Sequence, residues 1–230
     1  MEKKLDISKN KNVIILGKGN LAIKICDWFK NSSDYNLILV VPVIPEPKWT
    51  NSLRDWCENN SINYIPSGNY KDINMNLKID LAFSVFYDKI IKKDFINKCD
   101  RILNLHNSPL PLYRGVSPIN WALKDEREEH GITIHEITEG IDDGPIISQI
   151  KYSIYPEFEE VKDVYKKSIG YGYELFIATI PILDKIVAKK QEGTIIYHDS
   201  NENKFLGNRM GWTRHVSDNK ITKTKLKKYK

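Results

Sequence analysis

The chain has 230 residues, which is enough for one ordinary domain with a sizeable core. Its net charge of +5 is concentrated at the C-terminus, where positions 220–230 hold six lysines and no acidic residue. Removing those six charges leaves −1 for the rest of the chain. A body so close to neutral argues against a nucleic-acid partner, and we expect none.

Cysteine usage and apolar runs indicate the compartment. Cys26, Cys57 and Cys99 are scattered and odd in number, which is typical of reduced thiols and not of a disulfide framework or a zinc site. The first residues lack an apolar signal core, and no apolar run is long enough to span a bilayer. We therefore expect a cytoplasmic protein with no membrane partner.

Apolar runs alternate with segments of helical periodicity in the first half of the chain. A Pro-rich stretch, residues 44–49, is expected to be irregular. The expected strands are 12–16, 37–43, 63–66, 80–86 and 101–106, and the expected helices are 21–29, 52–60 and one that begins at 87–91.

The second half predicts one added antiparallel strand pair and a long helix. A helix begins at 118–123, strands follow at 131–137 and 146–150, and an amphipathic helix spans 161–189 with a kink at Pro181. The whole pattern predicts an α/β fold with a doubly wound, mostly parallel sheet. We expect a catalytic domain over 1–190 and a short C-terminal extension over 191–230 that ends in the basic tail.

The turn after the first strand has the sequence Gly17-Lys18-Gly19-Asn20 and precedes a helix. It matches half of a dinucleotide-binding fingerprint, with Ala22 in place of the third glycine. Two interpretations stay open: a nicotinamide cofactor bound at the helix N-terminus, and a tight turn that only needs the backbone freedom of glycine.

Asn104 and His106 end a buried strand and stand before a Pro-rich loop. Ligands of open α/β sheets bind at the carboxyl ends of the strands. An amide can donate to an oxyanion and an imidazole can accept a proton near neutral pH, so the pair suggests acyl transfer to an amine. Asp142 or Asp143, in a loop after another strand, can supply a carboxylate that fixes the imidazole tautomer.

Ordinary structural roles compete with this interpretation. A histidine after a strand can be a packed core residue, and Asp-Asp-Gly is a common turn sequence. His106, His130 and His135 lack the spacing of metal ligands, so we expect no metal. Ser108 lies near His106, but the Gly-x-Ser-x-Gly elbow of many serine hydrolases is absent.

Two motifs resemble those of the tetrahydrofolate-dependent formyltransferases. Residues 104–115, Asn-Leu-His-Asn-Ser-Pro-Leu-Pro-Leu-Tyr-Arg-Gly, are similar to the family's Asn-x-His and its following loop. Residues 131–147 are similar to its second signature. The resemblance covers about residues 12–185 and implies the family's Rossmann-like fold, with Asn104, His106 and Asp142 as catalytic residues.

The resemblance also implies a formyl donor, N10-formyltetrahydrofolate, whose pterin ring is held largely by backbone atoms of two loops. These loops match residues 86–91 and 139–142. The implied cofactor-binding residues are Phe86, Tyr87, Ile90, Ile91, Glu139, Gly140 and Ile141.

Within the family, residues 115–121 and 197–209 are most similar to nucleotide-sugar N-formyltransferases. The implied acceptor is a nucleotide-linked amino sugar such as dTDP-4-amino-4,6-dideoxyglucose, destined for a surface polysaccharide such as O-antigen. Relatives of this type are often dimers, and apolar residues 197–212 are a candidate interface, although packing within one monomer explains them equally well, so the oligomeric state stays open. The candidate substrate-binding residues are Lys48, Trp49, Asn107, Ser108, Arg114 and Arg209.

Two other acceptors stay open. Glycinamide ribonucleotide formyltransferases of purine synthesis have a similar length and a phosphate loop that residues 17–20 match in part. Methionyl-tRNA formyltransferases share the core but carry a C-terminal barrel, for which residues 191–230 are too few.

Overall fold

The computed structural model describes residues 10–206, which group into two compact units. Unit 1 extends to Asn104, and unit 2 begins at Leu105. Strand β4 (Ile102–His106) starts in the first and ends in the second. Each unit is described by itself.

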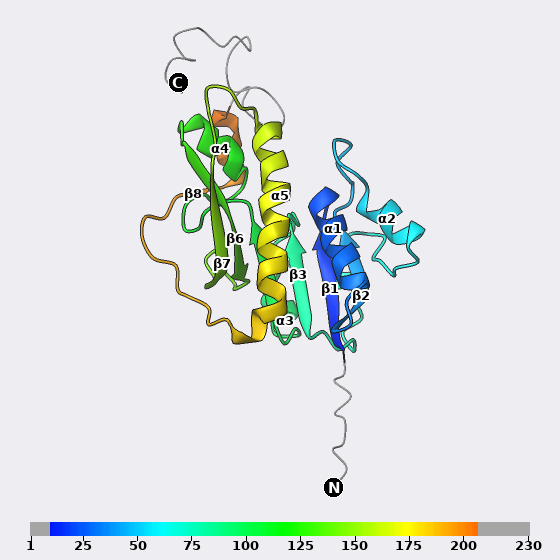
Figure 1. The fold of residues 1–230 in the computed structure, drawn as a ribbon. Coiled ribbons are helices and arrows are strands. Elements are labelled where there is room, and N and C mark those ends of the chain that lie inside the picture. The colour runs from blue at the N-terminus through cyan, green and yellow to red at the C-terminus, as the bar shows by residue number, and fades with distance from the viewer. Residues whose placement is uncertain (1–9, 207–230) are drawn as a thin grey trace. The chain divides into compact units, whose positions relative to one another are not determined.

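Unit 1 is built on a parallel sheet in which β1 lies between β2 and β3. Helix α1 packs against β1 and β2, as Figure 1 shows. The elements in chain order are β1 (Lys11–Gly17), α1 (Gly19–Lys30), β2 (Tyr35–Pro42), α2 (Leu53–Asn59), a 3-10 turn (Tyr70–Asp72), β3 (Leu81–Val85) and α3 (Lys93–Ile96).

Close packing in the turn between β1 and α1 explains why its first residue is glycine. A Cβ at Gly17 would lie 2.3 Å from the carbonyl oxygen of Val85 on β3, closer than real Cβ contacts allow. Gly19 has a φ of +72°, a conformation that glycine adopts without strain. Both glycines therefore have a structural reason in unit 1, which favours the tight-turn interpretation of this motif.

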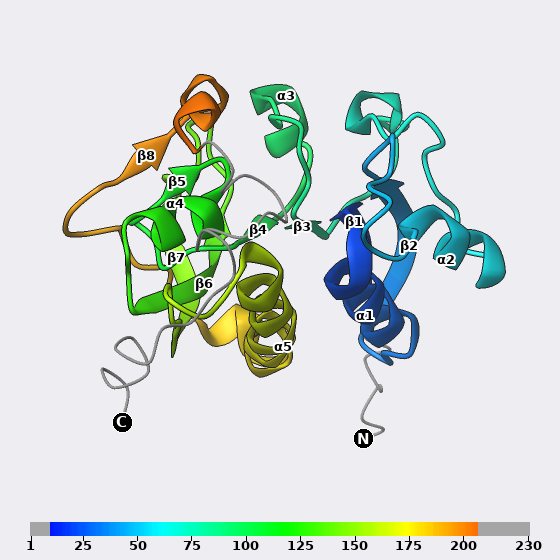
Figure 2. The same ribbon diagram turned by 90° about the horizontal axis from the view of Figure 1, so that it is seen from above.

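Unit 2 contains an antiparallel pair, β6 and β7, with the long helix α5 packed against both strands (Figure 2). Two short strands, β5 and β8, form a separate parallel pair. The elements are β5 (Arg114–Gly115), α4 (Pro118–Lys124), β6 (Glu129–Glu136), β7 (Ile146–Ser153), α5 (Val161–Thr179), a 3-10 helix (Ile180–Lys185), β8 (Tyr197–His198) and a 3-10 helix (Ser200–Phe205).

The structure differs from three expected elements. The helix expected over 161–189 ends as an α-helix at Thr179, because Pro181 cannot donate the next helical hydrogen bond, and 3-10 geometry follows. Residues 87–91 form no helix, and the short α3 begins at Lys93. The strand expected over 63–66 contributes one bridge, from Tyr64 to Val40.

The described residues after 190, up to 206, are part of unit 2. Strand β8 pairs with β5, and Lys189 pairs with Ile146 at the start of β7. The division into 1–190 and 191–230 stays a prediction. Among the described residues no helix has the length and apolarity needed to cross a membrane. All three cysteines are free thiols, and Cys26 and Cys57 are buried.

Candidate functional site

His106 and Asp142 come together in unit 2. His106 is the last residue of β4, and Asp142 lies in the loop between β6 and β7. His106 Nδ1 lies 3.4 Å from Asp142 Oδ2, and their side chains are only 8% and 14% exposed. The pairing that the two motifs predict is therefore present as a largely buried contact between the imidazole and the carboxylate.

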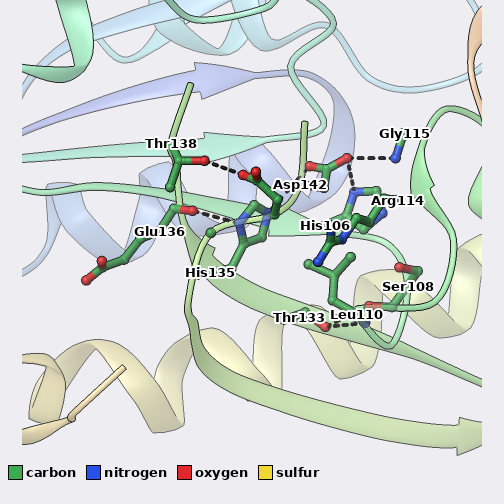
Figure 3. A network of polar contacts seen from close by, with 12 residues as sticks. His106, Ser108, Leu110, Arg114, Gly115, Thr133, His135, Glu136, Thr138 and Asp142 are labelled. Carbon is green, nitrogen blue, oxygen red and sulfur yellow. Dashed lines mark hydrogen bonds and ion pairs between the residues drawn. The ribbon is translucent and has the colours of Figure 1, made fainter. Parts of the chain in front are cut away.

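Three polar groups face the Asp142 carboxylate: the His106 ring, the His135 ring and the Gly115 backbone N–H. The Gly115 backbone N–H donates to Oδ2 at 2.9 Å, and His135 Nε2 lies 3.5 Å from Oδ1 (Figure 3). Burial raises the pKa of Asp142, but His106, His135 and the Gly115 N–H outweigh burial and hold this pKa well below its usual range. Asp142 is accordingly ionised at neutral pH.

The neighbouring aspartate has a different partner. Asp143 accepts a short hydrogen bond from the Thr138 hydroxyl, within the same loop. Asp142 has a left-handed backbone, with φ of +49°, and its carboxylate faces His106 and His135. Of the two aspartates left open by the residue pattern, Asp142 is thus the one that faces the imidazole.

The protonation of His106 follows from a backbone contact. Its Nε2 lies 2.8 Å from the carbonyl oxygen of Tyr113, which only accepts, so Nε2 carries the proton of the neutral ring. Burial lowers the pKa of His106, and the opposing effects of Asp142 and of the Tyr113 carbonyl do not reverse the shift. Asp142 faces the other ring nitrogen, Nδ1, and its control of the tautomer stays a prediction.

Asn104 is the remaining member of the predicted catalytic set. It stands two residues before His106 on β4, so the two side chains leave the strand on the same face. Its side chain is partly buried.

The two candidate residues that follow His106 are buried and bonded within unit 2. Asn107 Nδ2 donates to Ser168 Oγ at 3.2 Å, and Ser108 Oγ donates to the Leu112 carbonyl oxygen at 2.6 Å. The Ser108 hydroxyl thereby bonds the backbone of its own loop, which does not suit a hydrolytic nucleophile.

The first candidate folate loop follows β3. Phe86 has a φ of +58°, and the Tyr87 hydroxyl donates to the Gly68 carbonyl oxygen at 2.8 Å. Burial raises the pKa of Tyr87 to about 12. Ile90 is 59% exposed while Ile91 is buried, so the loop presents an apolar side chain to solvent.

The second candidate folate loop carries Asp142. Glu139, Gly140 and Ile141 are all exposed, and Ile141 is 40% exposed. Like the first loop, it offers an exposed isoleucine beside accessible backbone, which is compatible with a flat, partly apolar ring.

The other candidate substrate-binding residues lie apart from this pair in the chain. Lys48 and Trp49 are exposed, on a loop whose Glu46 carboxylate accepts from the Leu53 N–H at the start of α2. Arg114 adjoins Gly115 and donates to Gln191 through both Nε and Nη2. Arg209 lies outside the described residues.

Four residues that touch the pair were not assigned a role from the sequence: Tyr113, Gly115, His135 and Gln191. His135 lies in the second signature and Tyr113 in the loop of the first motif. The motifs therefore include both residues but give neither a function. No sequence pattern indicated a role for Gln191, because the residues that it bonds are distant in sequence. Over residues 10–206 no group of three or more His, Cys, Asp or Glu side chains has a geometry that suits a metal ion.

A model of the formyl transferase family matches residues 11–180, most of the chain. The chain belongs to this family. The tetrahydrofolate-dependent formyltransferase resemblance in the two motifs is thereby confirmed.

The similar curated proteins are longer. The bifunctional polymyxin resistance protein ArnA of Wigglesworthia glossinidia brevipalpis is 40% identical over 112 residues, covering 47% of this chain and 17% of its own length. Methionyl-tRNA formyltransferase of Thermosipho melanesiensis is 39% identical over 102 residues, covering 44% of this chain and 33% of its own length. The chain thus spans a third or less of these relatives.

Solved structures of sugar formyltransferases share the fold, so the predicted mostly parallel α/β architecture is confirmed. WlaRD, a sugar 3N-formyl transferase, has a TM-score of 0.73 at 27% identity, covering 84% of this chain and 70% of that one. An N-formyltransferase from Helicobacter canadensis, in complex with folinic acid and dTDP-3-aminofucose, has a TM-score of 0.72 at 29% identity, covering 84% and 72%. The formyltransferase PseJ of Anoxybacillus kamchatkensis has a TM-score of 0.60 at 26% identity, covering 88% and 94%.

Proposed function

We propose that this protein transfers a formyl group from N10-formyltetrahydrofolate to the amine of a nucleotide-linked amino sugar. The observation that carries the proposal is the buried His106–Asp142 pair, 3.4 Å apart, with Asn104 on the same face of β4 as His106. A proton acceptor, its counterion and an amide donor are the groups that acyl transfer to an amine requires.

His106 receives the proton that the amine loses when its nitrogen bonds to the formyl carbon. Because Nε2 donates to the Tyr113 carbonyl, the free lone pair of the neutral ring is on Nδ1. Burial keeps the pKa of His106 low enough for the ring to be neutral at neutral pH. Once Nδ1 is protonated, the Asp142 carboxylate at 3.4 Å stabilises the imidazolium.

Asn104 stabilises the oxyanion of the tetrahedral intermediate by donating from its side-chain amide. Removal of one such donor costs about 3 kcal/mol of transition-state stabilisation in comparable sites. In this assignment Asn104 acts on the oxygen and His106 on the nitrogen, so a variant of either residue leaves the other group in place.

The donor supplies the formyl group, and its pterin ring is assigned to the backbone of residues 86–91 and 139–141. Two features of the loops support this assignment: Ile90 and Ile141 are exposed, and Phe86 has a left-handed backbone that turns the chain sharply after β3. Folate complexes of WlaRD and of the Helicobacter canadensis enzyme, both above 25% identity to this chain, support the same donor.

The acceptor is assigned from the same two proteins and from PseJ. Their structures were determined with dTDP, with dTDP-3-aminofucose and with a UDP-linked formamido sugar, respectively. We therefore favour a dTDP- or UDP-linked amino sugar, used in the cytoplasm for surface polysaccharide synthesis. Lys48, Trp49 and Arg114 are proposed to contact it. A homodimer is proposed as well, since Tyr197 and Phe205 are exposed apolar residues.

Methionyl-tRNA is the second candidate acceptor. Several methionyl-tRNA formyltransferases are 38–41% identical to this chain, although over only 44–53% of its length. The near-neutral body of the chain disfavours a tRNA substrate.

The test incubates the protein with N10-formyltetrahydrofolate and one acceptor at a time, with mass spectrometry as the readout. The acceptors are dTDP-4-amino-4,6-dideoxyglucose, dTDP-3-aminofucose, glycinamide ribonucleotide and methionyl-tRNA. We expect a gain of one formyl group on a dTDP-amino sugar, and loss of this product in His106→Ala with folate binding retained. Formylation of methionyl-tRNA alone, or undiminished turnover by His106→Ala, would overturn the proposal.

A further inference from the structure

Gln191 joins the segment after α5 to the loop that carries Asp142. Its Nε2 donates to the carbonyl oxygens of Asp142 at 2.9 Å and Gly144 at 2.7 Å. Its Oε1 accepts from Arg114 Nε at 3.0 Å and Nη2 at 2.6 Å. Both donors and both lone pairs of the amide are therefore used within unit 2.

The backbone on each side of Gln191 is fixed to a strand. Two residues before it, Lys189 exchanges two hydrogen bonds with Ile146, at 2.7 and 2.8 Å. A few residues after it, the Ile196 carbonyl oxygen accepts from the Arg114 N–H at 2.9 Å, next to the β5–β8 pair. Gln191 is thus held between the start of β7 and β5, and its side chain reaches the loop from a fixed position.

The Gln191 bonds fall on the part of the loop that sets the Asp142 side chain. Asp142 has a φ of +49°, a conformation that a residue with a Cβ adopts only when its surroundings impose it. Donors on the Asp142 carbonyl and on the Gly144 carbonyl hold two peptide units, 142–143 and 144–145, that directly follow this strained torsion. The same amide bonds Arg114, whose neighbour Gly115 donates to the Asp142 carboxylate.

We propose that Gln191 is a positioning residue that holds Asp142 against His106. The effect on catalysis rests on the function proposed above, whereas the effect on His106 itself does not. The four hydrogen bonds of the Gln191 amide reach neither the His106 ring nor the Asp142 carboxylate; Gln191 acts through the backbone of the loop and through Arg114.

Two substitutions distinguish a role of Gln191 in positioning Asp142 from a role in only anchoring the segment after α5. Gln191→Met keeps the length of the side chain and removes all four hydrogen bonds without changing charge. Gln191→Glu keeps an acceptor for Arg114 and replaces the two donors with an oxygen that repels the carbonyls of Asp142 and Gly144. If Gln191 only anchored the segment, both variants would lower stability and leave the pKa of His106 unchanged. Glu192→Gln, an exposed neighbour, is the matched control.

The first readout is the pKa of His106, measured by NMR titration of the histidine ring in the full chain, with His106→Gln used for assignment. Asp142 raises this pKa, so its withdrawal in Gln191→Met lowers the pKa by about one pH unit. The added charge in Gln191→Glu would by itself raise the pKa, so a fall in that variant reports movement of Asp142. In an Asp142→Asn background, Gln191→Met has no further effect.

The second readout is steady-state formyl transfer to the dTDP-amino sugar that the wild type uses. We expect kcat to fall about 10- to 100-fold in both Gln191 variants, with KM for the donor changed less, because the reacting groups are misplaced and not lost. Glu192→Gln retains wild-type kcat and the wild-type pKa of His106. An unchanged His106 pKa in both Gln191 variants would overturn the inference. If the wild type formylates no acceptor, the proposed function fails, and the titration still decides the role of Gln191.

Discussion

His135 Nε2 lies 3.5 Å from Asp142 Oδ1, so the carboxylate that faces His106 also faces a second buried imidazole. His135 Nδ1 lies 2.8 Å from the Glu136 carbonyl oxygen, which only accepts, and this nitrogen therefore carries a proton. His135 is thus held by the end of β6 while its other nitrogen is directed at Asp142 (Figure 3). The arrangement fixes both oxygens of the carboxylate, one for each ring.

Because Nδ1 already carries a proton, Nε2 can donate to Asp142 only in the protonated ring, and we expect His135 to support the carboxylate in this form. Glutamine can place a donor near the Nε2 position, whereas leucine fills the buried space without one. His135→Gln should therefore retain much of the wild-type kcat, and His135→Leu should lose about tenfold or more through a poorly held carboxylate. The measurement is kcat for formyl transfer, with thermal unfolding as the check on folding. Equal kcat values for the two folded variants would contradict this role.

The two adjacent aspartates offer a matched pair of substitutions. Asp142→Asn removes the counterion of His106, and kcat should fall on the order of 100-fold or more, the size of a general acid–base contribution. In Asp143→Asn the amide oxygen can still accept from the Thr138 hydroxyl, so kcat should stay close to that of wild type. Steady-state rates of both variants, compared at one pH, check this. A larger loss in Asp143→Asn would reverse the assignment of the carboxylate.

His130 makes the folded state sensitive to acid. It is fully buried with Nε2 2.9 Å from the Asn107 carbonyl oxygen, and burial lowers its pKa to about 4, against about 6.5 in the unfolded chain. Between these values the unfolded state binds more protons, so the His130 contribution to stability is complete above about pH 6.5 and is lost as pH falls toward 4. At pH 4.5 the loss is about 2–3 kcal/mol.

Urea unfolding at pH 7 and pH 4.5 measures this effect. His130→Gln keeps a donor for the Asn107 carbonyl and does not titrate, so its unfolding free energy should change less between the two pH values than that of wild type. If the two proteins lose the same free energy on acidification, another group is responsible.

Much of the fold was readable from the sequence because buried parallel strands are continuous apolar runs. Residues 13–16 of β1 are all fully buried, and the run predicted that strand to within one residue at each end. The end of α5 was less accessible to prediction, because apolar residues continue with helical spacing beyond Pro181. There the missing N–H of proline decides against the pattern.

The residues of the site likewise differ in how far the sequence predicts them. His106 and Asp142 lie in motifs whose residue types and order are specific, and the structure brings the two together. Tyr113 acts on His106 through a backbone carbonyl, which every residue type possesses, so no side-chain pattern can report it. Gln191 contacts residues 47 and 49 positions earlier in the chain, and only the folded backbone places its amide there.

Two glycines of unit 2 provide the last prediction. A Cβ at Gly144 would lie 1.8 Å from the carbonyl oxygen of Glu136, the same oxygen that His135 Nδ1 contacts. Gly144→Ala should therefore displace the loop and disturb both His135 and the Gln191 bond, lowering stability by about 1–3 kcal/mol and kcat by about tenfold or more. At Gly170, in α5, an added Cβ meets nothing within 4 Å. Gly170→Ala should stabilise the protein by about 0.5–1 kcal/mol without changing kcat, since alanine favours the helix. Urea unfolding and steady-state rates of both variants test the pair, and a Gly144→Ala enzyme with wild-type kcat would show that the loop need not press against β6.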